Sequence, residues 1–184
     1  IMLLNLGAGT SEVSVISLNG VVTSKTINKG GDYIDDAIID LFRDKKRLDI
    51  GRQTAEDIKI NLLSLRIKDG ETSITVDGRD LLSAAPKTVD VKSKDLVECI
   101  MPYADEIVNM IYEVLEKVPP ELTADIKKDG FGLTGGLSQI RGLREYIEHK
   151  LNLSSYISDN LETDAILGAG KILEDPDRFF KYRK

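Results

Sequence analysis

The chain has 184 residues, of which 41% are hydrophobic and 30% are charged, and this composition excludes an intrinsically disordered protein. Thirty-one acidic residues outnumber 25 basic ones, so the formal net charge is −6 and no global positive field favours nucleic-acid binding. Cys99 and His149 are the only residues of their types, which excludes an internal disulfide and argues against a zinc finger or a Ser-His-Asp hydrolase. With no export signal at the N-terminus, these counts predict a reducing, cytoplasmic compartment.

The first 50 residues predict a meander of strands followed by a helix. Apolar and β-rich segments at 1–6, 13–18 and 21–27 predict three consecutive antiparallel strands. Asn19-Gly20 predicts a type I′ turn between the second and third strands, because that turn needs positive φ at both positions. Asp32 is predicted to cap a helix whose apolar residues recur at helical spacing.

Residues 51–93 predict a small inserted lobe with both helix and strand. Thr54 and Asp57 resemble a capping box at the start of a second helix. Asp77-Gly78 predicts another two-residue hairpin turn. The predicted strands of this lobe are 72–76, 79–83 and 87–91.

The second half of the chain predicts an alternation of helices and strands. A long amphipathic helix is expected from residue 93 to the proline pair at 119–120, with Pro102 either kinking it or marking its start. Residues 131–133 predict a buried strand that runs into Thr134-Gly135-Gly136 and a helix over 138–150. A strand, a glycine turn and a helix form a common ligand-binding geometry. A strand near 155–157 and a helix over 163–173 complete the prediction.

Three segments carry residues that suit ligand binding. Gly7-Ala8-Gly9-Thr10 predicts a tight turn whose amides could bind phosphate oxygens, although a plain hairpin would use the same residues. Gly135 and Gly136 would let a planar base or a sugar approach the backbone. Glu56 and Lys59 are neighbours on one helical face, where they could equally form a solvated ion pair. No catalytic residue and no metal ligand is predicted.

The order of these segments resembles the MreB/Mbl family of bacterial actins far more specifically than any segment does alone. The resemblance extends along nearly the whole chain, but it covers only the C-terminal half of that family's molecule, subdomains IIA and IIB. The segments that carry it are 12–22, Gly30-Gly31-Asp32, 35–39, 54–59, 119–122, 133–136 and Gly168-Ala169-Gly170-Lys171.

The resemblance implies an α/β, actin-like (ribonuclease H-like) ATPase domain half, with a central mixed sheet, flanking helices and a small inserted α+β lobe. The IIA-like core would be 1–50 and 94–184, and the IIB-like insertion would be 51–93. In this family ATP and Mg²⁺ bind between two similar halves, and the protein forms filaments that determine rod shape. By the resemblance, the residues that bind the nucleotide are Gly7, Ala8, Gly9, Thr10, Glu56, Lys59, Gly135 and Gly136.

The same resemblance implies partners and a location. The full-length parent would associate with itself into filaments in the cytoplasm, close to the membrane. Its IIA-like core would bind a membrane-anchored shape-determining partner, and this half would neither insert into the membrane nor bind nucleic acid.

Three departures from the family pattern predict a divergent nucleotide site. Asn5 replaces the aspartate that begins the family's phosphate loop, and Ala8 replaces a glycine. Leu137 stands where the family usually has a third glycine, against the expected position of adenine. Because the family's first half, with its own phosphate loop and catalytic acid, has no counterpart here, the chain alone is predicted to have little or no ATPase activity. The alternatives are a nucleotide-independent interaction module and, ranked last, a fragment of a sugar or acetate kinase.

Overall fold

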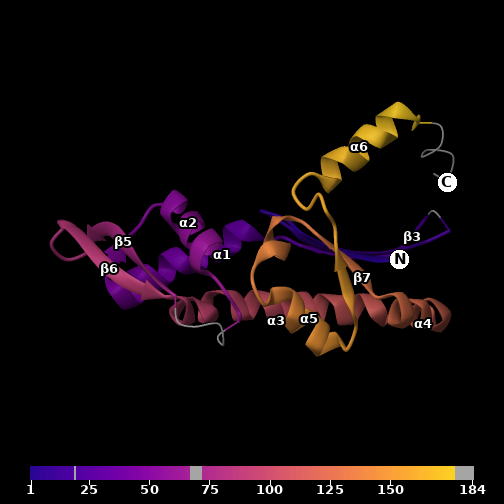
Figure 1. Ribbon diagram of the computed structural model, residues 1–184, viewed down its shortest axis with the longest axis horizontal. Helices are drawn as coiled ribbons and strands as arrows, with labels where there is room; N and C mark the ends of the chain where they lie inside the picture. Colours follow the sequence, from indigo (N-terminus) through magenta and orange to yellow (C-terminus); the bar gives the residue numbers. More distant parts are fainter. Residues whose placement is uncertain (19, 67–71, 177–184) are drawn as a thin grey trace.

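The computed structural model describes residues 1–18, 20–66 and 72–176 and shows an elongated molecule built around two sheets (Figure 1). The larger sheet has the strand order β3-β2-β1-β7-β8. β1 pairs antiparallel with β2 and parallel with β7, so the sheet is mixed, as expected from the sequence. The strands of this sheet are β1 (Met2–Leu6), β2 (Ser11–Ser17), β3 (Gly20–Ile27), β7 (Phe131–Thr134) and β8 (Ser155–Ile157).

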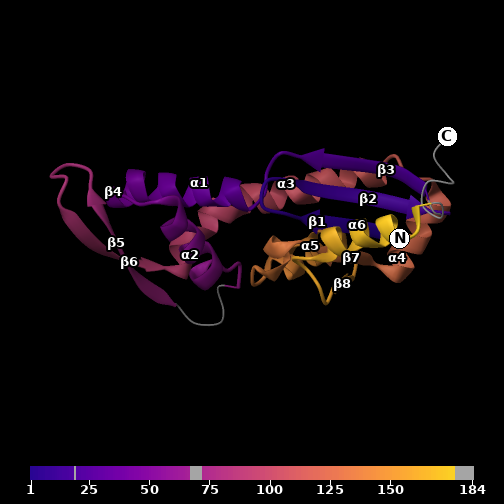
Figure 2. The same cartoon turned by 90° about the horizontal axis from the view of Figure 1, so that it is seen from above.

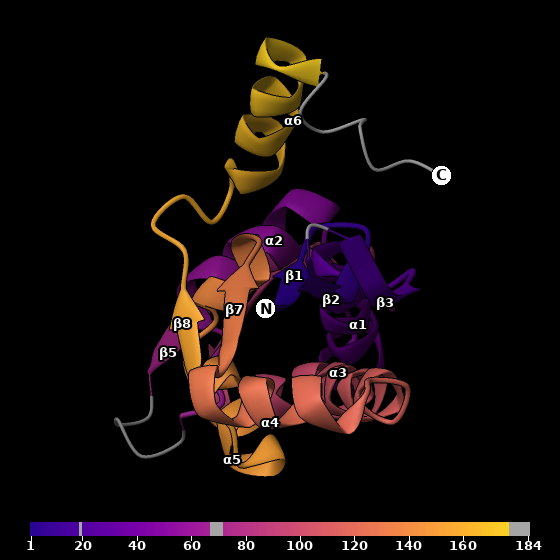
Figure 3. The same ribbon diagram turned by 90° about the vertical axis from the view of Figure 1, so that its right-hand side faces the viewer.

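Buried and partly exposed side chains alternate along β1 and β2, and this alternation shows which face of the larger sheet is buried. Met2, Leu4 and Leu6 are fully buried, whereas the residues between them are partly exposed. The buried face packs against helices, and α3, α4 and α5 lie on that side of the sheet (Figure 3). The helices are α1 (Gly31–Leu41), α2 (Arg52–Leu62), α3 (Val97–Leu115), α4 (Pro120–Asp129), α5 (Leu143–Leu151) and α6 (Asp164–Glu174).

Helix α6 stands apart from the rest of the molecule, on the opposite side of the larger sheet (Figures 1 and 3). None of its residues is buried, and Ile166 and Leu173 are 68% and 79% exposed. In the part of the chain that the structure describes, no helix is both long and apolar enough to cross a membrane.

The smaller sheet, in the order β4-β5-β6, lies with α2 toward one end of the long axis (Figure 2). Its strands are β4 (Leu48–Asp49), β5 (Ser73–Asp80) and β6 (Pro86–Lys92). The prediction of a hairpin turn at Asp77-Gly78 is wrong, because both residues pair with β6 inside β5. Gly78 lacks a side chain because β4 occupies that space: a Cβ there would lie 2.6 Å from the Asp49 carbonyl oxygen. The real turn is at residues 81–85, where Asp80 Oδ1 accepts hydrogen bonds from the amides of residues 82 and 83 at 3.0 and 2.9 Å.

The three antiparallel strands at the N-terminus are confirmed, but the turn between β2 and β3 lies one residue earlier than predicted. Ser17 pairs with Gly20, so the connection is residues 18–19, and Leu18 adopts a φ of 49°. A shift in pairing between Val15 and Ile16 moves the turn. Asn19 itself lies outside the described residues.

Several predicted helix boundaries are corrected. Neither Asp32 nor Thr54 caps a helix, because α1 and α2 begin after Gly30 and Gly51, without a side-chain cap. Pro102 lies inside α3, which starts at Val97 after a short 3₁₀ helix (Ser93–Leu96). Helix α4 was not predicted, although Pro120 at its first position, an acidic first turn, a basic last turn and a following glycine all favour it.

The helix predicted over 138–150 is divided by a contact with the chain after α2. A 3₁₀ helix (Gly136–Gln139) comes first, and α5 starts only after Gly142, whose φ is 85°. The amide of Leu65 donates to the Arg141 carbonyl at 2.8 Å, and a Cβ at Gly142 would lie 2.8 Å from the amide of Arg66. This tertiary contact, which sequence periodicity does not reveal, interrupts the helix.

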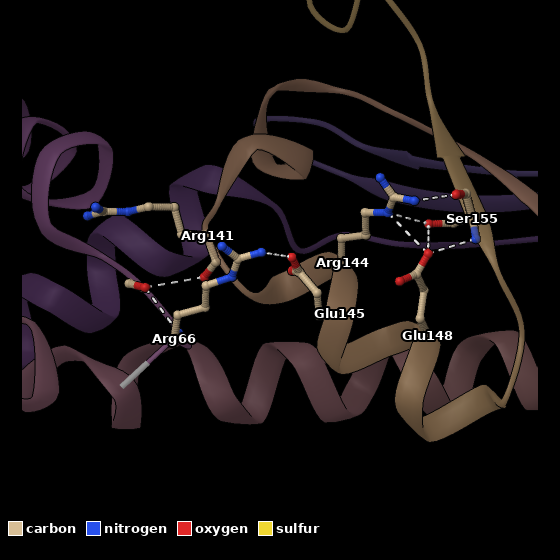
Figure 4. A network of polar contacts seen from close by, with 7 residues as sticks. Arg66, Arg141, Arg144, Glu145, Glu148 and Ser155 are labelled. Atoms are coloured by element: carbon tan, nitrogen blue, oxygen red, sulfur yellow. Dashed lines mark hydrogen bonds and ion pairs between the residues drawn. The ribbon is translucent and has the colours of Figure 1, made fainter. Parts of the chain in front are cut away.

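A polar network along α5 ties this junction to the larger sheet (Figure 4). Arg66 forms an ion pair with Glu145 at the start of α5. Further along, Glu148 Oε1 accepts hydrogen bonds from Arg144 Nε at 3.1 Å and from the amide and hydroxyl of Ser155 at 2.8 and 2.7 Å. Burial raises the pKa of Glu148, but the Ser155 and Arg144 donors outweigh it, so the pKa is lowered. The network therefore joins α5 to β8.

Candidate functional site

A turn after β1 forms one wall of the candidate site. The amide of Gly7 donates to the Thr10 carbonyl at 3.0 Å and closes the turn. The carbonyls of Gly7 and Ala8 accept hydrogen bonds from the amides of Gly31 and Asp32, at 3.1 and 2.9 Å. The first amides of α1 are therefore paired with the loop, and the loop is held against the helix.

Gly30 makes this contact possible. A Cβ at position 30 would lie 2.7 Å from the carbonyl carbon of Ala8 and closer still to the carbonyl oxygens of Gly7 and Ala8. A larger residue would separate the loop from α1.

The chain after β7 forms the second wall. Gly135 has a φ of 88°, and a Cβ there would lie 2.5 Å from the carbonyl carbon of Leu6 and 2.7 Å from Asn5 Oδ1. Gly136 differs, because a Cβ there would meet no atom within 4 Å. The first glycine is required by packing against β1, whereas the second leaves open space beside the backbone.

Polar contacts join this turn to the start of α6. Thr134 Oγ1 donates to Asp164 Oδ2 at 2.6 Å. Hydrogen bonds from Ser158 and from Thr134 hold the pKa of Asp164 below its usual range. Asp164 is therefore a carboxylate at neutral pH.

Helices α1 and α2 form the third wall, where a lysine and an aspartate meet. Lys59 Nζ donates to Asp35 Oδ2 at 2.8 Å and to the Gly31 carbonyl at 3.4 Å. Burial raises the pKa of Asp35, the Lys59 ammonium opposes that rise, and the charges of Glu56 and Asp32 add to it.

The three walls line an open cavity of about 950 Å³. Six of the eight residues predicted to bind a ligand line it, although they come from three distant parts of the chain. Gly9 and Thr10 do not line it. The predicted residues on its wall are Gly7, Ala8, Glu56, Lys59, Gly135 and Gly136.

The two residues that depart most from the expected pattern also lie on this cavity. Leu137 is only 6% exposed and belongs to the hydrophobic core, so most of its side chain faces protein rather than the cavity. Asn5 pairs with Thr134 in the sheet and lines the cavity from β1.

Sequence reasoning missed several polar residues of this site. Arg141, Gln139 and Asp164 line the cavity, and Asp35 lies behind Lys59. A signal for Asp35 was present, since it falls on the apolar stripe of α1 beside Ile34, where a carboxylate needs a buried partner. Among the described residues, no group of three or more His, Cys, Asp or Glu side chains could hold a metal ion.

Solved structures define the class of protein. The chain resembles MreB5 of Spiroplasma citri bound to AMPPNP, with a TM-score of 0.90 and 28% identity over 98% of this chain and 54% of that one. It also resembles the MamK double helical filament, with a TM-score of 0.79 and 21% identity over 95% of this chain and 54% of that one. The fold is that of an actin-like protein.

The family follows from the sequence comparison. The family described as MreB/Mbl protein matches residues 1–181, and the chain belongs to that family. It is 34% identical to the cell shape-determining protein Mbl of Bacillus subtilis (strain 168) over 98% of this chain and 54% of that protein. It is 36% identical to the cell shape-determining protein MreB of Escherichia coli (strain K12) over 94% of this chain and 50% of that protein. The chain thus spans about half the length of these relatives.

Proposed function

We propose that this chain forms one side of the ATP site of an MreB-like filament protein that determines rod shape and organises wall synthesis. It would correspond to the C-terminal half, with a IIA-like core at 1–50 and 94–184 and a IIB-like insertion at 51–93. The pairing of β4 (Leu48–Asp49) with β5 in the smaller sheet would add these two residues to the proposed insertion.

One observation carries the proposal: two glycine turns and the Glu56/Lys59 pair meet at one cavity. The cavity's volume, about 950 Å³, is within the range of about 300–1,000 Å³ usual for ligand pockets. Gly136 leaves space for a planar group, and Lys59 supplies a cation to the cavity wall formed by α1 and α2. MreB5 of Spiroplasma citri, which has this fold, has been solved with AMPPNP and with ADP.

The departures at Asn5 and Leu137 make the proposed site divergent without filling it. The buried position of Leu137 supports a cavity that still accepts adenine. Mg²⁺ usually binds through one or two carboxylates together with the phosphates of its nucleotide, so we propose that it enters with ATP. When bound, the ion would neutralise phosphate charge.

Calorimetry and thermal unfolding with Mg-ADP and Mg-AMPPNP test the proposal. A ligand at 100 times its Kd adds about 2.7 kcal/mol, which should raise the Tm by about 5–10 °C. Glu56→Gln should weaken binding, whereas Asp57→Asn should not, because Asp57 is the exposed neighbour and does not line the cavity. The absence of both heat and Tm shift at millimolar nucleotide would contradict the proposal and favour a nucleotide-independent interaction module.

We propose further that this chain alone hydrolyses little or no ATP. Phosphoryl transfer depends on groups that position and stabilise the phosphates from both sides, and this chain spans half of its relatives. Turnover above a buffer blank that survives repurification would contradict this.

Self-association into filaments in the cytoplasm, near the membrane, is the remaining part of the proposal, together with a membrane-anchored shape-determining partner for the IIA-like core. The names of the relatives, which are cell shape-determining proteins, support it. Co-sedimentation with a full-length homologue, with and without nucleotide, tests it. Pelleting that is independent of nucleotide would instead favour the interaction module.

A further inference from the structure

Helix α1 buries a carboxylate that the proposed site does not explain. Asp35 is 3% exposed and lies on the apolar face of the helix, beside Ile34 and Ile38. Its Oδ2 accepts the hydrogen bond from Lys59, but its Oδ1 is buried and has no hydrogen-bond partner in the part of the chain that the structure describes.

This arrangement is costly for a purely structural ion pair. Burying a carboxylate is unfavourable unless its oxygens are paired, and an apolar pair of similar volume is often as stable. The other charges that face Asp35 are Glu56 on α2 and Asp32 on α1, and both disfavour its ionised form. In the part of the chain that the structure describes, Lys59 is the cation that compensates the Asp35 carboxylate, so the two side chains are held together tightly.

The second feature of this pair is the position of Lys59, which lies at the cavity wall. The Lys59 side chain is only 11% exposed, yet Lys59 lines the cavity. Its ammonium also contacts the Gly31 carbonyl at 3.4 Å, and a Cβ at Gly31 would lie 3.1 Å from Nζ. A flexible side chain is thus confined between one carboxylate and a glycine that leaves it room.

We propose that Asp35 is a positioning residue that holds the Lys59 ammonium at a fixed point on the cavity wall, where it meets a polar or anionic oxygen of a nucleotide. The nucleotide part of this statement rests on the proposed function. The Gly31 amide donates a hydrogen bond to the Gly7 carbonyl, and Gly31 lies one helical turn before Asp35. Helix α1 therefore contacts both the loop after β1 and the Lys59 ammonium from α2, so one helix fixes the relative positions of these two parts of the cavity wall.

The first test measures the lysine without any nucleotide. The rate at which a water-soluble amine acetylating reagent modifies Lys59 is followed by peptide mass spectrometry at pH 7.5, with exposed Lys128 as the internal reference. In the wild-type chain Lys59 should react at least tenfold more slowly than Lys128. Asp35→Asn should raise the Lys59 rate about tenfold, and Asp36→Asn, which alters an exposed carboxylate on the same helix, should leave it unchanged.

Lys29 reports whether helix α1 has simply melted. Its ammonium pairs with Glu106 of α3 at 2.6 Å and lies 4.6 Å from the ring centre of Tyr33 in the first turn of α1, so unfolding of α1 would remove the ring cover and raise its rate as well. A rise at Lys59 with no rise at Lys29 supports positioning. If Asp35→Asn does not fold, Asp35→Glu keeps the charge, moves the carboxylate and should give the same selective rise. A Lys59 rate within twofold of wild type, or an equal rise at Lys29, would overturn the proposal.

The second test measures the affinity for Mg-ADP by calorimetry. Asp35→Asn and Lys59→Gln should each weaken binding about tenfold, and the double variant should be no weaker than either, because both act through one ammonium. Unchanged affinity in Asp35→Asn, with Lys59 released, would overturn the positioning role. If the wild-type chain binds no Mg-ADP, the proposed function fails, and the labelling rates still decide whether Asp35 holds Lys59.

Discussion

The two adjacent glycines of the β7 turn should respond in opposite ways to the same added methyl group. At Gly135, alanine would have to adopt a φ of 88°, which costs about 1–2 kcal/mol for a residue with a Cβ. Its Cβ would also lie 2.5 Å from the carbonyl carbon of Leu6, whereas real Cβ atoms essentially never approach closer than 3.0 Å. The turn and β1 must therefore move apart, and overpacking of this kind costs about 1–3 kcal/mol.

The sum predicts that Gly135→Ala lowers the free energy of unfolding by about 2–5 kcal/mol, a large part of the 5–15 kcal/mol typical of a domain. Gly136→Ala is the matched control, because its added methyl group meets no atom within 4 Å. We expect it to stay within about 1 kcal/mol of wild type.

Urea unfolding followed by circular dichroism measures both variants. With a slope of about 2 kcal/mol per molar urea, Gly135→Ala should move the midpoint down by about 1–2.5 M, with the slope unchanged. Gly136→Ala should keep the midpoint but weaken Mg-ADP binding, because its methyl group enters the cavity. If the two variants unfold within 0.5 kcal/mol of each other, the packing argument for Gly135 is refuted.

Three further predictions concern other parts of the molecule. Burial, together with the charge of Glu98, raises the pKa of the Cys99 thiol to about 12. The protonated thiol therefore contributes stability that is fully present below pH 9 and is lost as the pH rises toward 12. At pH 8 an aromatic disulfide reagent should label Cys99 only after urea is added. Glu148→Gln should lower the free energy of unfolding by about 1–2 kcal/mol at pH 7. The pKa of Glu148 is lowered in the folded state, so its ionised form stabilises the fold at pH values above the ordinary glutamate pKa, and this stabilisation is lost as the pH falls through the lowered pKa. Urea titrations should therefore show the variant and the wild type converging in acid, and a gap that stays constant with pH would contradict this. Gly30→Ala should push Ala8 away from α1, lower the free energy of unfolding by about 2 kcal/mol or more and weaken Mg-ADP binding; an unchanged urea midpoint would show that the loop adapts.

Local sequence signals predicted the strands of the larger sheet and most helices, because alternation and helical spacing report directly on which face of an element is buried. The N-terminal meander and the strand at Ser155–Ile157 follow this rule. The order of the glycine turns was specific enough to indicate the family. It also indicated six residues that the fold brings to one cavity.

Tertiary structure alone decided the turns and the groups behind the site. Asp77-Gly78 reads locally as a hairpin turn, but β4 and β6 hold it inside a strand. A continuous helical pattern runs through Gly142, but the chain after α2 interrupts it there. Asp35 and Lys59 are 24 residues apart in the sequence, and they become partners only when α1 and α2 pack together. Local propensity is a weak preference that such long-range contacts readily override, because burial and backbone pairing involve larger free energies.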